Sequence, residues 1–234
     1  MILIIFDVDG TLVYSNRVDS RCFALTYERL YERPFPSIDW TRYPHVTDTS
    51  IFSSVIEEQF QREVEPGEID HFTDHFVAAL REMRDKQPQE FRSVPGARAA
   101  VLNLLQSDGF TVGIATGGWK RPARLKLQHV GIPEQGLFFS GADGKVTREA
   151  IIEEVIDGVK AASIEYERVV YIGDAIWDVT TTRNLQMDFV GIRRNKDVEH
   201  LFRVGATQVI TDYLDFDHFL EAIQKATPPN GGSS

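Results

Sequence analysis

Several short runs of this chain have consecutive apolar residues rather than apolar residues at alternate positions. The three clearest are Ile2–Phe6, Thr111–Ala115 and Arg168–Ile172. Weaker runs of the same kind cover 137–140, 189–192 and 208–210. A continuous apolar run suits a strand that is covered on both faces, as in a parallel sheet. The runs therefore predict buried parallel strands.

Stretches with helical spacing fill the gaps between these runs. Pro95 and Pro122 each begin one such stretch, Gly109 and Gly131 end them, and a third apolar stripe covers 151–159. Proline is favoured at the first turn of a helix and glycine just after the last. Strands that alternate with helices in this way predict an α/β fold, a doubly wound parallel sheet.

Residues 16–92 break this alternation. Their apolar spacing indicates helices alone, over Val18–Arg33, Thr49–Glu63 and Pro66–Lys86. We therefore expect an all-helical domain, inserted after the first strand of the α/β core. The expected organisation is a core over 1–15 and 93–227, an inserted helical domain over 16–92, and a disordered tail over 228–234, where PPNGGSS offers little to bury.

The charge and cysteine content exclude some classes of function. The formal net charge is −10, so the chain repels nucleic-acid phosphates and anionic membranes, and we expect neither as a partner. No apolar run approaches the ~20 residues of a membrane-spanning helix. The first residues lack the basic leader of a signal peptide, so the expected location is the cytoplasm. The single cysteine, Cys22, excludes an internal disulfide and a cysteine-based metal cluster.

Acidic and hydroxyl side chains stand at the ends of three predicted strands. They are Asp7 with Asp9, Thr116, and Asp174 with Asp178. In doubly wound sheets, ligands bind at the carboxyl ends of the strands. Carboxylates gathered in one crevice repel one another unless a cation lies between them, and Mg²⁺ prefers oxygen ligands of this kind. The strand ends therefore predict a magnesium site that could also hold an anionic substrate.

Three motifs resemble those of one enzyme family. DVDGTL at 7–12, IATGG at 114–118 and IGDAIWD at 172–178 resemble, in order, the first, second and fourth motifs of the haloacid dehalogenase-like (HAD) phosphatase superfamily. The resemblance covers about residues 1–215. It implies a Rossmann-like HAD core with a helical cap inserted over the site, and Mg²⁺ as the cofactor.

The first and fourth motifs supply the expected nucleophile and metal ligands. A carboxylate is ionised at neutral pH, so Asp7 can attack phosphorus and form an aspartyl-phosphate. Asp9 lies two residues on, on the same side of an extended segment, where it can protonate the leaving group and later deprotonate water. The resemblance implies that Asp7, Asp174 and the Asp9 carbonyl ligate the metal. Asp178 is either a further ligand or a support for the others.

The second and third motifs concern the phosphoryl group. Thr116 offers a hydroxyl, and Gly117 a bare backbone amide, just before a predicted helix. In the family, a lysine usually stands near the start of the helix before GDxxxD. Here Arg148 occupies the expected place and Lys145 competes with it. We favour Arg148, because it directly precedes the apolar stripe and a guanidinium can bind phosphate in a bidentate manner.

One polar cluster in the insert is a candidate for contacts with the substrate. His45, Thr47 and Asp48 lie in a loop just before a predicted helix. Thr47 or Asp48 could instead be the N-cap of that helix, and His45 could be an exposed loop residue.

These patterns together predict a Mg²⁺-dependent phosphate-monoester hydrolase that acts on a small phosphorylated metabolite through an aspartyl-phosphate. A phosphomutase of a sugar phosphate would use the same motifs and stays an alternative. A non-catalytic protein of this fold is a weaker one, because fold does not imply function. A carbon–halogen hydrolase is disfavoured because those members lack the second aspartate, which is present here as Asp9.

Overall fold

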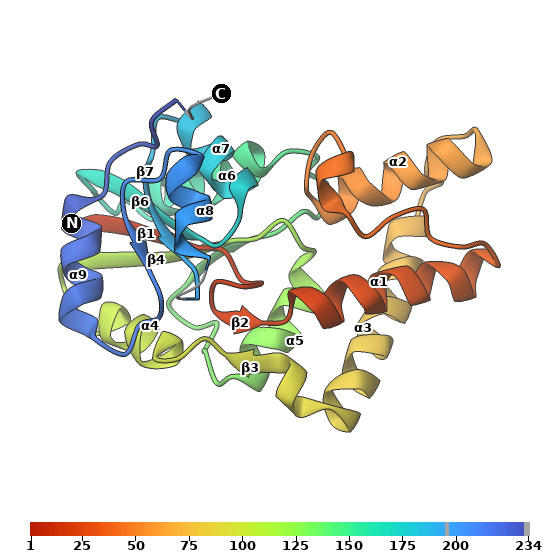
Figure 1. Ribbon diagram of the computed structural model, residues 1–234, viewed down its shortest axis with the longest axis horizontal. Coiled ribbons are helices and arrows are strands. Elements are labelled where there is room, and N and C mark those ends of the chain that lie inside the picture. Colours follow the sequence, from red (N-terminus) through yellow and green to blue (C-terminus); the bar gives the residue numbers. More distant parts are fainter. Residues whose placement is uncertain (195–196, 232–234) are drawn as a thin grey trace.

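Six parallel strands form the central sheet, in the order β5-β4-β1-β6-β7-β8 (Figure 1). The computed structural model describes residues 1–194 and 197–231. The strands are β1 (Ile2–Phe6), β4 (Phe110–Ala115), β5 (Phe138–Ser140), β6 (Arg168–Gly173), β7 (Asp188–Ile192) and β8 (Val209–Ile210). The doubly wound parallel sheet predicted from the apolar runs is confirmed.

Strand β1 lies at the centre of this sheet. It pairs in parallel with β4 on one side and with β6 on the other. The side chains from Leu3 to Phe6 are fully buried, which explains why the run is apolar at every position. Phe6 pairs with both Ile114 and Ile172, so the three strands end level with one another.

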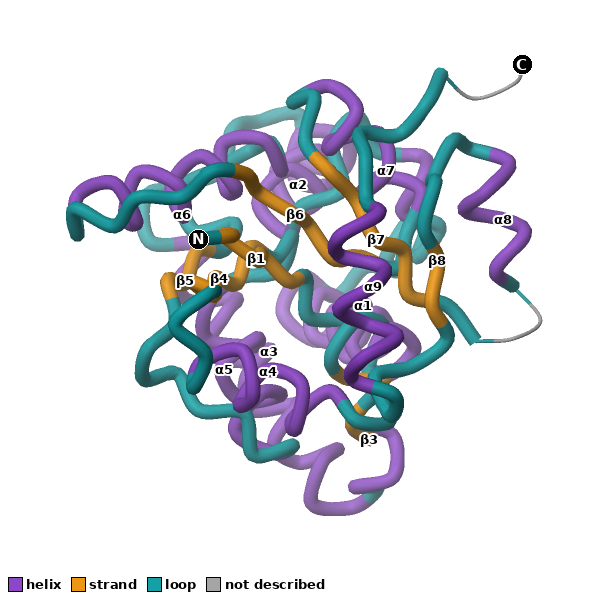
Figure 2. The backbone as a smooth tube through the Cα atoms, turned by 90° about the vertical axis from the view of Figure 1, so that its left-hand side faces the viewer, coloured by secondary structure: helices purple, strands orange, loops and turns teal. Residues whose placement is uncertain are grey.

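Helices cover both faces of the sheet. Those of the α/β part are α4 (Ala97–Leu105), α5 (Lys120–His129), α6 (Arg148–Ala161), α7 (Ile176–Asn184), α8 (Val198–Arg203) and α9 (Phe216–Lys225). Helices α6 and α7 lie on one face, and α4 and α9 on the other (Figure 1, Figure 2). Among the described residues, we find no helix with the length and apolar character needed to cross a bilayer.

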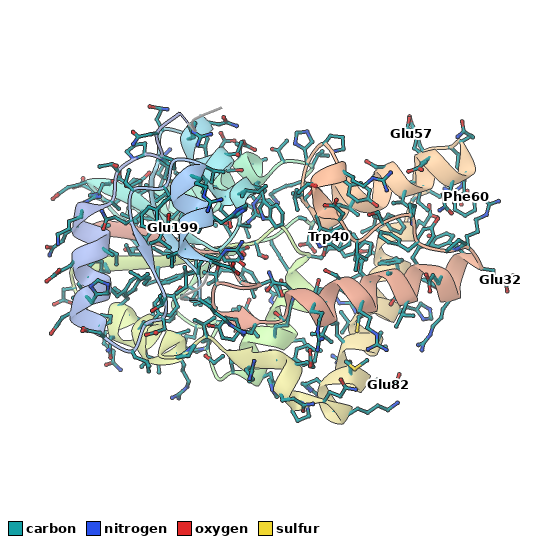
Figure 3. All side chains as sticks on the ribbon, viewed as in Figure 1. Glu32, Trp40, Glu57, Phe60, Glu82 and Glu199 are labelled. Carbon is teal, nitrogen blue, oxygen red and sulfur yellow. The ribbon has the colours of Figure 1, made fainter. Side chains whose placement is uncertain are left out.

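The segment between 16 and 91 is helical and stands beside the sheet (Figure 1). It contains α1 (Asn16–Tyr31), α2 (Asp48–Phe60) and α3 (Glu68–Lys86), with short 3₁₀ turns η1 (Trp40–Arg42) and η2 (Pro88–Phe91). The core of this segment is aromatic. The centroid of the Phe23 ring lies 4.9 Å from that of Phe72 and 5.8 Å from that of Trp119, which belongs to the α/β part. In Figure 3, Trp40 lies at the end nearer the sheet and Glu57 near the far end.

Two short strands join the inserted helices to the α/β part. β2 (Val13–Tyr14) and β3 (Arg92–Ser93) pair in an antiparallel manner. The sequence did not predict them, because two residues are too few to show a periodicity. They hold together the outgoing and returning chain at the limits expected for the insert.

Helices α4 and α5 each begin two residues away from the proline that was expected to open them. Helix α4 begins at Ala97 rather than at Pro95, because Gly96 has a φ of 78°, a left-handed value that does not continue a helix. Helix α5 begins at Lys120, two residues before Pro122. Proline is tolerated anywhere in the first turn because the amides there have no partner within the helix.

Part of the tail that was expected to be disordered packs against the protein. The Asn230 amide donates to the Gly205 carbonyl at 2.9 Å, and the Arg183 side chain donates to the Asn230 carbonyl at 2.8 Å. Pro229 is buried. The expectation of disorder is therefore wrong for residues 229–230, because backbone groups there find partners. Residues 232–234 lie outside the described residues.

Candidate active site

The ends of three adjacent strands bring predicted site residues to one edge of the sheet. Asp7 follows β1, Thr116 follows β4 and Asp174 follows β6, and all three are buried. The Asp7 amide donates to the Ile172 carbonyl at 2.9 Å. This bond extends the pairing of β1 with β6 by one residue and fixes the backbone of Asp7 between the two neighbouring strands.

Three carboxylates converge at this edge. Asp7, Asp174 and Asp178 each offer an oxygen, and these oxygens lie within 4.8 Å of one another. Burial raises the pKa of Asp7 from 3.8 to about 7. Burial, helped by the charges of Asp178 and Asp7, also raises the pKa of Asp174 well above its usual value. Ionised oxygens packed in this way fit a hard divalent cation such as Mg²⁺, which would offset their repulsion.

The turn after Asp7 allows a close approach to Asp174. Gly10 has a φ of 81°, which favours glycine. A β-carbon at Gly10 would overlap the carboxylate of Asp174. The glycine of DVDG therefore lets the loop after β1 pack directly against the end of β6.

Arg148, the first residue of α6, supplies a buried positive charge. Its Nη2 donates to three oxygens: Asp178 Oδ1 at 2.6 Å, the Tyr171 hydroxyl at 3.1 Å and Asp7 Oδ1 at 3.2 Å. Lys145 instead forms an ion pair with Glu154 at 2.5 Å. Of the two competitors for the third motif, the structure brings Arg148 to the strand ends and leaves Lys145 elsewhere.

Asp178 is completely buried and uses both of its oxygens. Oδ1 accepts from Arg148, and Oδ2 accepts from the Ala175 amide at 3.0 Å, at the start of α7. Its contacts are those of a support, which orients Arg148 and fixes the beginning of the helix.

Thr116 and the two glycines after it form a tight loop. The Gly118 amide donates to Thr116 Oγ1 at 3.2 Å. A β-carbon at Gly117 would overlap Arg148 Nη1 and approach the Val46 carbonyl at 2.7 Å. Glycine at position 117 therefore lets the guanidinium lie against the backbone of this loop.

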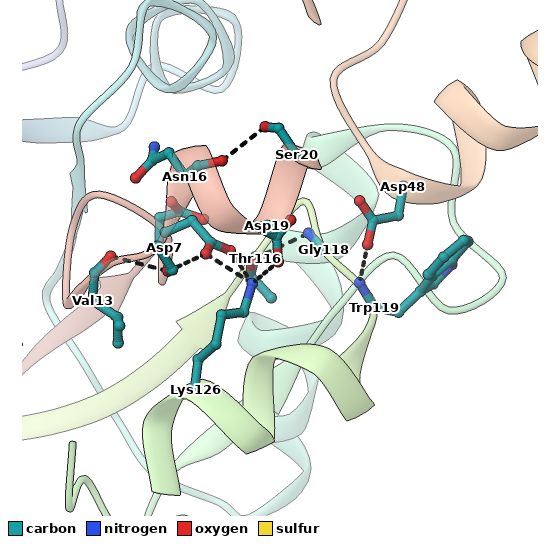
Figure 4. A network of polar contacts seen from close by, with 12 residues as sticks. Asp7, Val13, Asn16, Asp19, Ser20, Asp48, Thr116, Gly118, Trp119 and Lys126 are labelled. Atoms are coloured by element: carbon teal, nitrogen blue, oxygen red, sulfur yellow. Dashed lines mark hydrogen bonds and ion pairs between the residues drawn. The ribbon is translucent and has the colours of Figure 1, made fainter. Parts of the chain in front are cut away.

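A buried lysine that the sequence analysis missed holds Asp9. Lys126 Nζ donates to the two Asp9 oxygens at 2.6 and 2.8 Å and to Asp19 Oδ1 at 2.6 Å, and Ser15 Oγ donates to Asp9 at 2.5 Å. Figure 4 shows Lys126 reaching up from α5 toward Asp19 of α1. The lysine side chain is 1% exposed. Lys126 therefore connects the α/β part to the inserted helices, because Asp9 belongs to the former and Asp19 to the latter.

The spacing along α5 contained a signal for this lysine. Lys126 lies three residues after Ala123 and four after Pro122, both of which are buried. Helical spacing therefore places it on the inner face, where a charge needs a partner. Burial raises the pKa of Asp19 to about 6, and Lys126 opposes the rise.

The loop before α2 contacts the α/β part directly. Thr47 is the N-cap of α2, because its Oγ1 accepts from the Ser50 amide at 3.2 Å. Asp48 accepts from the Trp119 amide at 2.9 Å, a contact drawn in Figure 4. His45 is exposed and is not among the residues that line the cavity between the strand ends and the inserted helices.

A cavity of about 420 Å³ lies between the strand ends and the inserted helices. Its lining from the α/β part includes Asp7, Asp9, Thr116, Arg148 and Asp174. Its lining from the inserted helices includes Phe23, Trp40, Thr47, Asp48 and Ile51. The wall from the α/β part is thus mainly charged or polar, whereas the wall from the inserted segment mixes apolar side chains with polar and charged ones, among them Arg17 and Asp19.

Comparison with known proteins gives one family match. The model of the family described as "Haloacid dehalogenase-like hydrolase" matches residues 4–192. No curated protein matches the chain.

Solved structures share the fold. A hydrolase from Pseudomonas syringae is similar over 94% of this chain and 98% of its own, with a TM-score of 0.65 and 19% identity. CbbY from Rhodobacter sphaeroides, in complex with phosphate, covers 92% and 95%, with a TM-score of 0.66 and 14% identity. A candidate β-phosphoglucomutase from Bacteroides vulgatus covers 96% and 89%, with a TM-score of 0.64 and 17% identity.

Proposed function

Because the chain belongs to the haloacid dehalogenase-like hydrolase family, we propose that it hydrolyses a small phosphate monoester through an aspartyl-phosphate on Asp7. The observation that carries this proposal is the position of Asp7, buried at a strand end beside both Arg148 and Asp174. A carboxylate can attack an anionic phosphorus centre where positive charge offsets the repulsion. Arg148 and a bound cation would supply that charge.

The proposed reaction has two steps. An oxygen of Asp7 attacks phosphorus as the bond to the leaving alcohol breaks, and Asp9 gives the leaving oxygen its proton. Water, deprotonated by Asp9, then attacks phosphorus and breaks the bond to Asp7, which releases phosphate. Arg148, the Thr116 hydroxyl and the Gly117 amide hold the phosphoryl oxygens throughout.

Mg²⁺ is the proposed cofactor, held by the carboxylates of Asp7 and Asp174 and by the Asp9 carbonyl. When bound, it offsets the charge of the nucleophile and of the phosphoryl group. We assign Asp178 a supporting role instead, because both of its oxygens already accept hydrogen bonds.

We assign residues 16–92 to a cap over a core formed by 1–15 and 93–227. The lining of the cavity supports this assignment, because the inserted segment contributes Phe23, Trp40 and Asp19 to the side that faces the strand ends. A cap in this place would contact the leaving group and exclude water. Thr47 and Asp48 line the same cavity while holding α2 against the core, whereas the exposed His45 has no contact that supports a role with the substrate.

The experiment is a phosphate-release assay over a panel of phosphorylated metabolites with Mg²⁺, followed by Asp7→Asn on the best substrate. We expect Asp7→Asn to lower kcat by more than about a thousandfold, because the amide cannot act as nucleophile. EDTA should stop turnover until Mg²⁺ is restored. Asp108→Asn, at an exposed residue just before the amino end of β4 and therefore at the opposite edge of the sheet, is the matched control. Near-normal turnover in Asp7→Asn would rule out covalent catalysis.

A phosphomutase is the second candidate, favoured by the structural similarity to the protein described as a candidate β-phosphoglucomutase. Such an enzyme would return the phosphoryl group from Asp7 to the sugar. If a sugar phosphate is converted to its isomer and no free phosphate appears, the protein is a mutase and not a phosphatase.

A further inference from the structure

A second cavity, of about 530 Å³, adjoins the first. Asn16, Arg17 and Asp174 line both cavities, so the two meet beside the carboxylate at the end of β6. The second cavity lies where the inserted helices join the α/β part. Tyr14 and Arg92, from β2 and β3, form one side of it, and the segment after β7 forms the other.

The lining of this cavity carries unpaired positive charge. Four arginines line it: Arg17, Arg92, Arg193 and Arg194. Arg17 pairs with Glu90 at 2.7 Å. Within 1–194 and 197–231, the other three form no ion pair, although Asp197 also lines the cavity. Three unpaired guanidinium groups in a chain of net charge −10 indicate a place that attracts an anion.

One of these guanidinium groups is partly buried with an unused donor, and another is stacked on an aromatic ring. The Arg193 Nε is buried and, among the described residues, has no hydrogen-bond partner. A buried donor without an acceptor is unfavourable, and an anion in the cavity would relieve it. Arg194 stacks over the Tyr14 ring, with Cζ 3.9 Å from the ring centroid. Stacking restricts the side chain while leaving the donors at the edge of its plane free.

The same pattern occurs at the phosphate end of the site. Arg148 is the other arginine of the described chain whose buried Nε lacks a partner, and it lines the first cavity. Each of the two adjoining cavities therefore contains an arginine with a buried, unused donor.

We propose that the second cavity binds a second oxyanion of the substrate, a carboxylate or a phosphate at the far end of the leaving group. This rests on the proposed function, which puts the reacting phosphate at Asp7. A leaving group that passes Asn16 and Asp174 reaches Arg193 and Arg194. Arginine binds both kinds of oxyanion through paired donors. The substrate class is thus a phosphate ester with a second anionic group.

The experiment uses phosphate esters that differ in their far end. Phosphate esters with a three-carbon or a six-carbon chain carry a hydroxyl, a carboxylate or a second phosphate at the far end of the chain, and kcat/KM is measured for each with Mg²⁺. We expect at least one anionic end to be preferred over the hydroxyl end by about tenfold or more, as one charge-assisted contact provides. The end group that gives the larger kcat/KM, carboxylate or phosphate, identifies which oxyanion the second cavity binds.

Arg194→Ala and Arg92→Ala should each reduce that preference by about tenfold. Arg81→Ala removes a comparably exposed arginine on α3, outside both cavities, and should leave the preference unchanged. An equal kcat/KM for all ends at both chain lengths would overturn the proposal, as would a preference that survives in both arginine variants.

Binding separates failure of this inference from failure of the proposed function. Titration calorimetry of the same compounds with the Asp7→Asn protein and Mg²⁺ needs no turnover. Suppose that compounds with anionic ends bind more tightly, but the unaltered protein releases no phosphate from any of them. That result would support the second cavity and reject the proposed phosphatase activity. Phosphate release with no preference in either assay would reject the second cavity alone.

Discussion

Single buried charges in this site are balanced by specific partners. Arg148 donates hydrogen bonds to both Asp7 and Asp178, and Lys126 donates to both Asp9 and Asp19. Each cation therefore holds a carboxylate that the proposed reaction uses and a second one that it does not. Loss of Arg148 would leave two buried acids without a counter-charge, and loss of Lys126 would leave two half-buried ones.

The contrast between Arg148 and Lys145 gives a prediction for activity. Arg148→Ala should lower kcat/KM by about a hundredfold or more, because it removes a donor to the phosphoryl group. Lys145→Ala removes only an ion pair with Glu154 outside the site and should change kcat/KM by less than about threefold. Kinetics on one substrate, with far-UV circular dichroism to check the fold, measures both. The reverse order would mean that Lys145 fills the third-motif role.

Lys126 gives a prediction for stability. Lys126→Met leaves Asp9 and Asp19 without their counter-charge and should lower the free energy of unfolding by about 3–5 kcal/mol. Adding Asp19→Asn should recover part of this loss. Urea denaturation of the single and double variants tests both statements, with Lys86→Met at an exposed ion pair as control. A loss below about 1 kcal/mol would show that the lysine is not needed as a counter-ion.

The sequence revealed some of these residues and not others, for a physical reason. Asp7, Thr116 and Asp174 were found because each follows an apolar run that predicts a strand. Lys126 was missed because its partners lie more than 100 residues away along the chain. A local pattern could show that the lysine faces inward but not which acids it would meet.

Elements with a strong periodicity were predicted well, and junctions were not. The strands and the long helices of the insert appear within a few residues of their expected bounds. The pairing of β2 with β3 was not foreseen, because each has two residues and depends on its partner. Pro122 misled the prediction for the start of α5, since proline tolerates several positions in a first turn.

Helix α2 meets the α/β part through a small set of hydrogen bonds. Thr49 Oγ1 donates to the Ala142 carbonyl at 2.5 Å and accepts from Trp119 Nε1 at 2.9 Å. Thr47 Oγ1 donates to the Val146 carbonyl at 2.8 Å. These contacts hold the start of α2 over the loops after β4 and β5.

Thr49→Val should weaken this contact between elements. Valine keeps the shape but leaves Ala142 and Trp119 without their partner, so the free energy of unfolding should fall by about 1–3 kcal/mol. KM should rise as well if the first turn of α2 closes the cavity. Thr180→Val, at an exposed hydroxyl bonded within its own helix, is the control. An unchanged stability and KM would show that α2 is held by apolar packing alone.

For the whole molecule, the buried acids make stability depend on pH and on metal. The pKa of Asp7 is raised from 3.8 to about 7, so between these values the folded protein keeps a proton that the unfolded chain loses. The free energy of unfolding of the metal-free protein should therefore fall as pH rises through this window. Mg²⁺ binds the ionised carboxylates, so its stabilising effect should increase with pH.

Thermal unfolding with and without Mg²⁺, at about pH 5 and about pH 8, measures this linkage. The increase in Tm on adding Mg²⁺ should be larger at the higher pH, and Asp7→Asn should reduce the difference. An equal increase at both pH values would mean that the metal does not bind to ionised Asp7 and Asp174.

The central place of β1 has a consequence for how the chain is made. β1 leaves the ribosome before both of its hydrogen-bonding neighbours, which are β4, beginning at Phe110, and β6, beginning at Arg168. Until those residues are synthesised, an apolar strand has both edges unpaired, which invites association with other chains. Biogenesis of this protein should therefore depend on whatever shields β1 during translation.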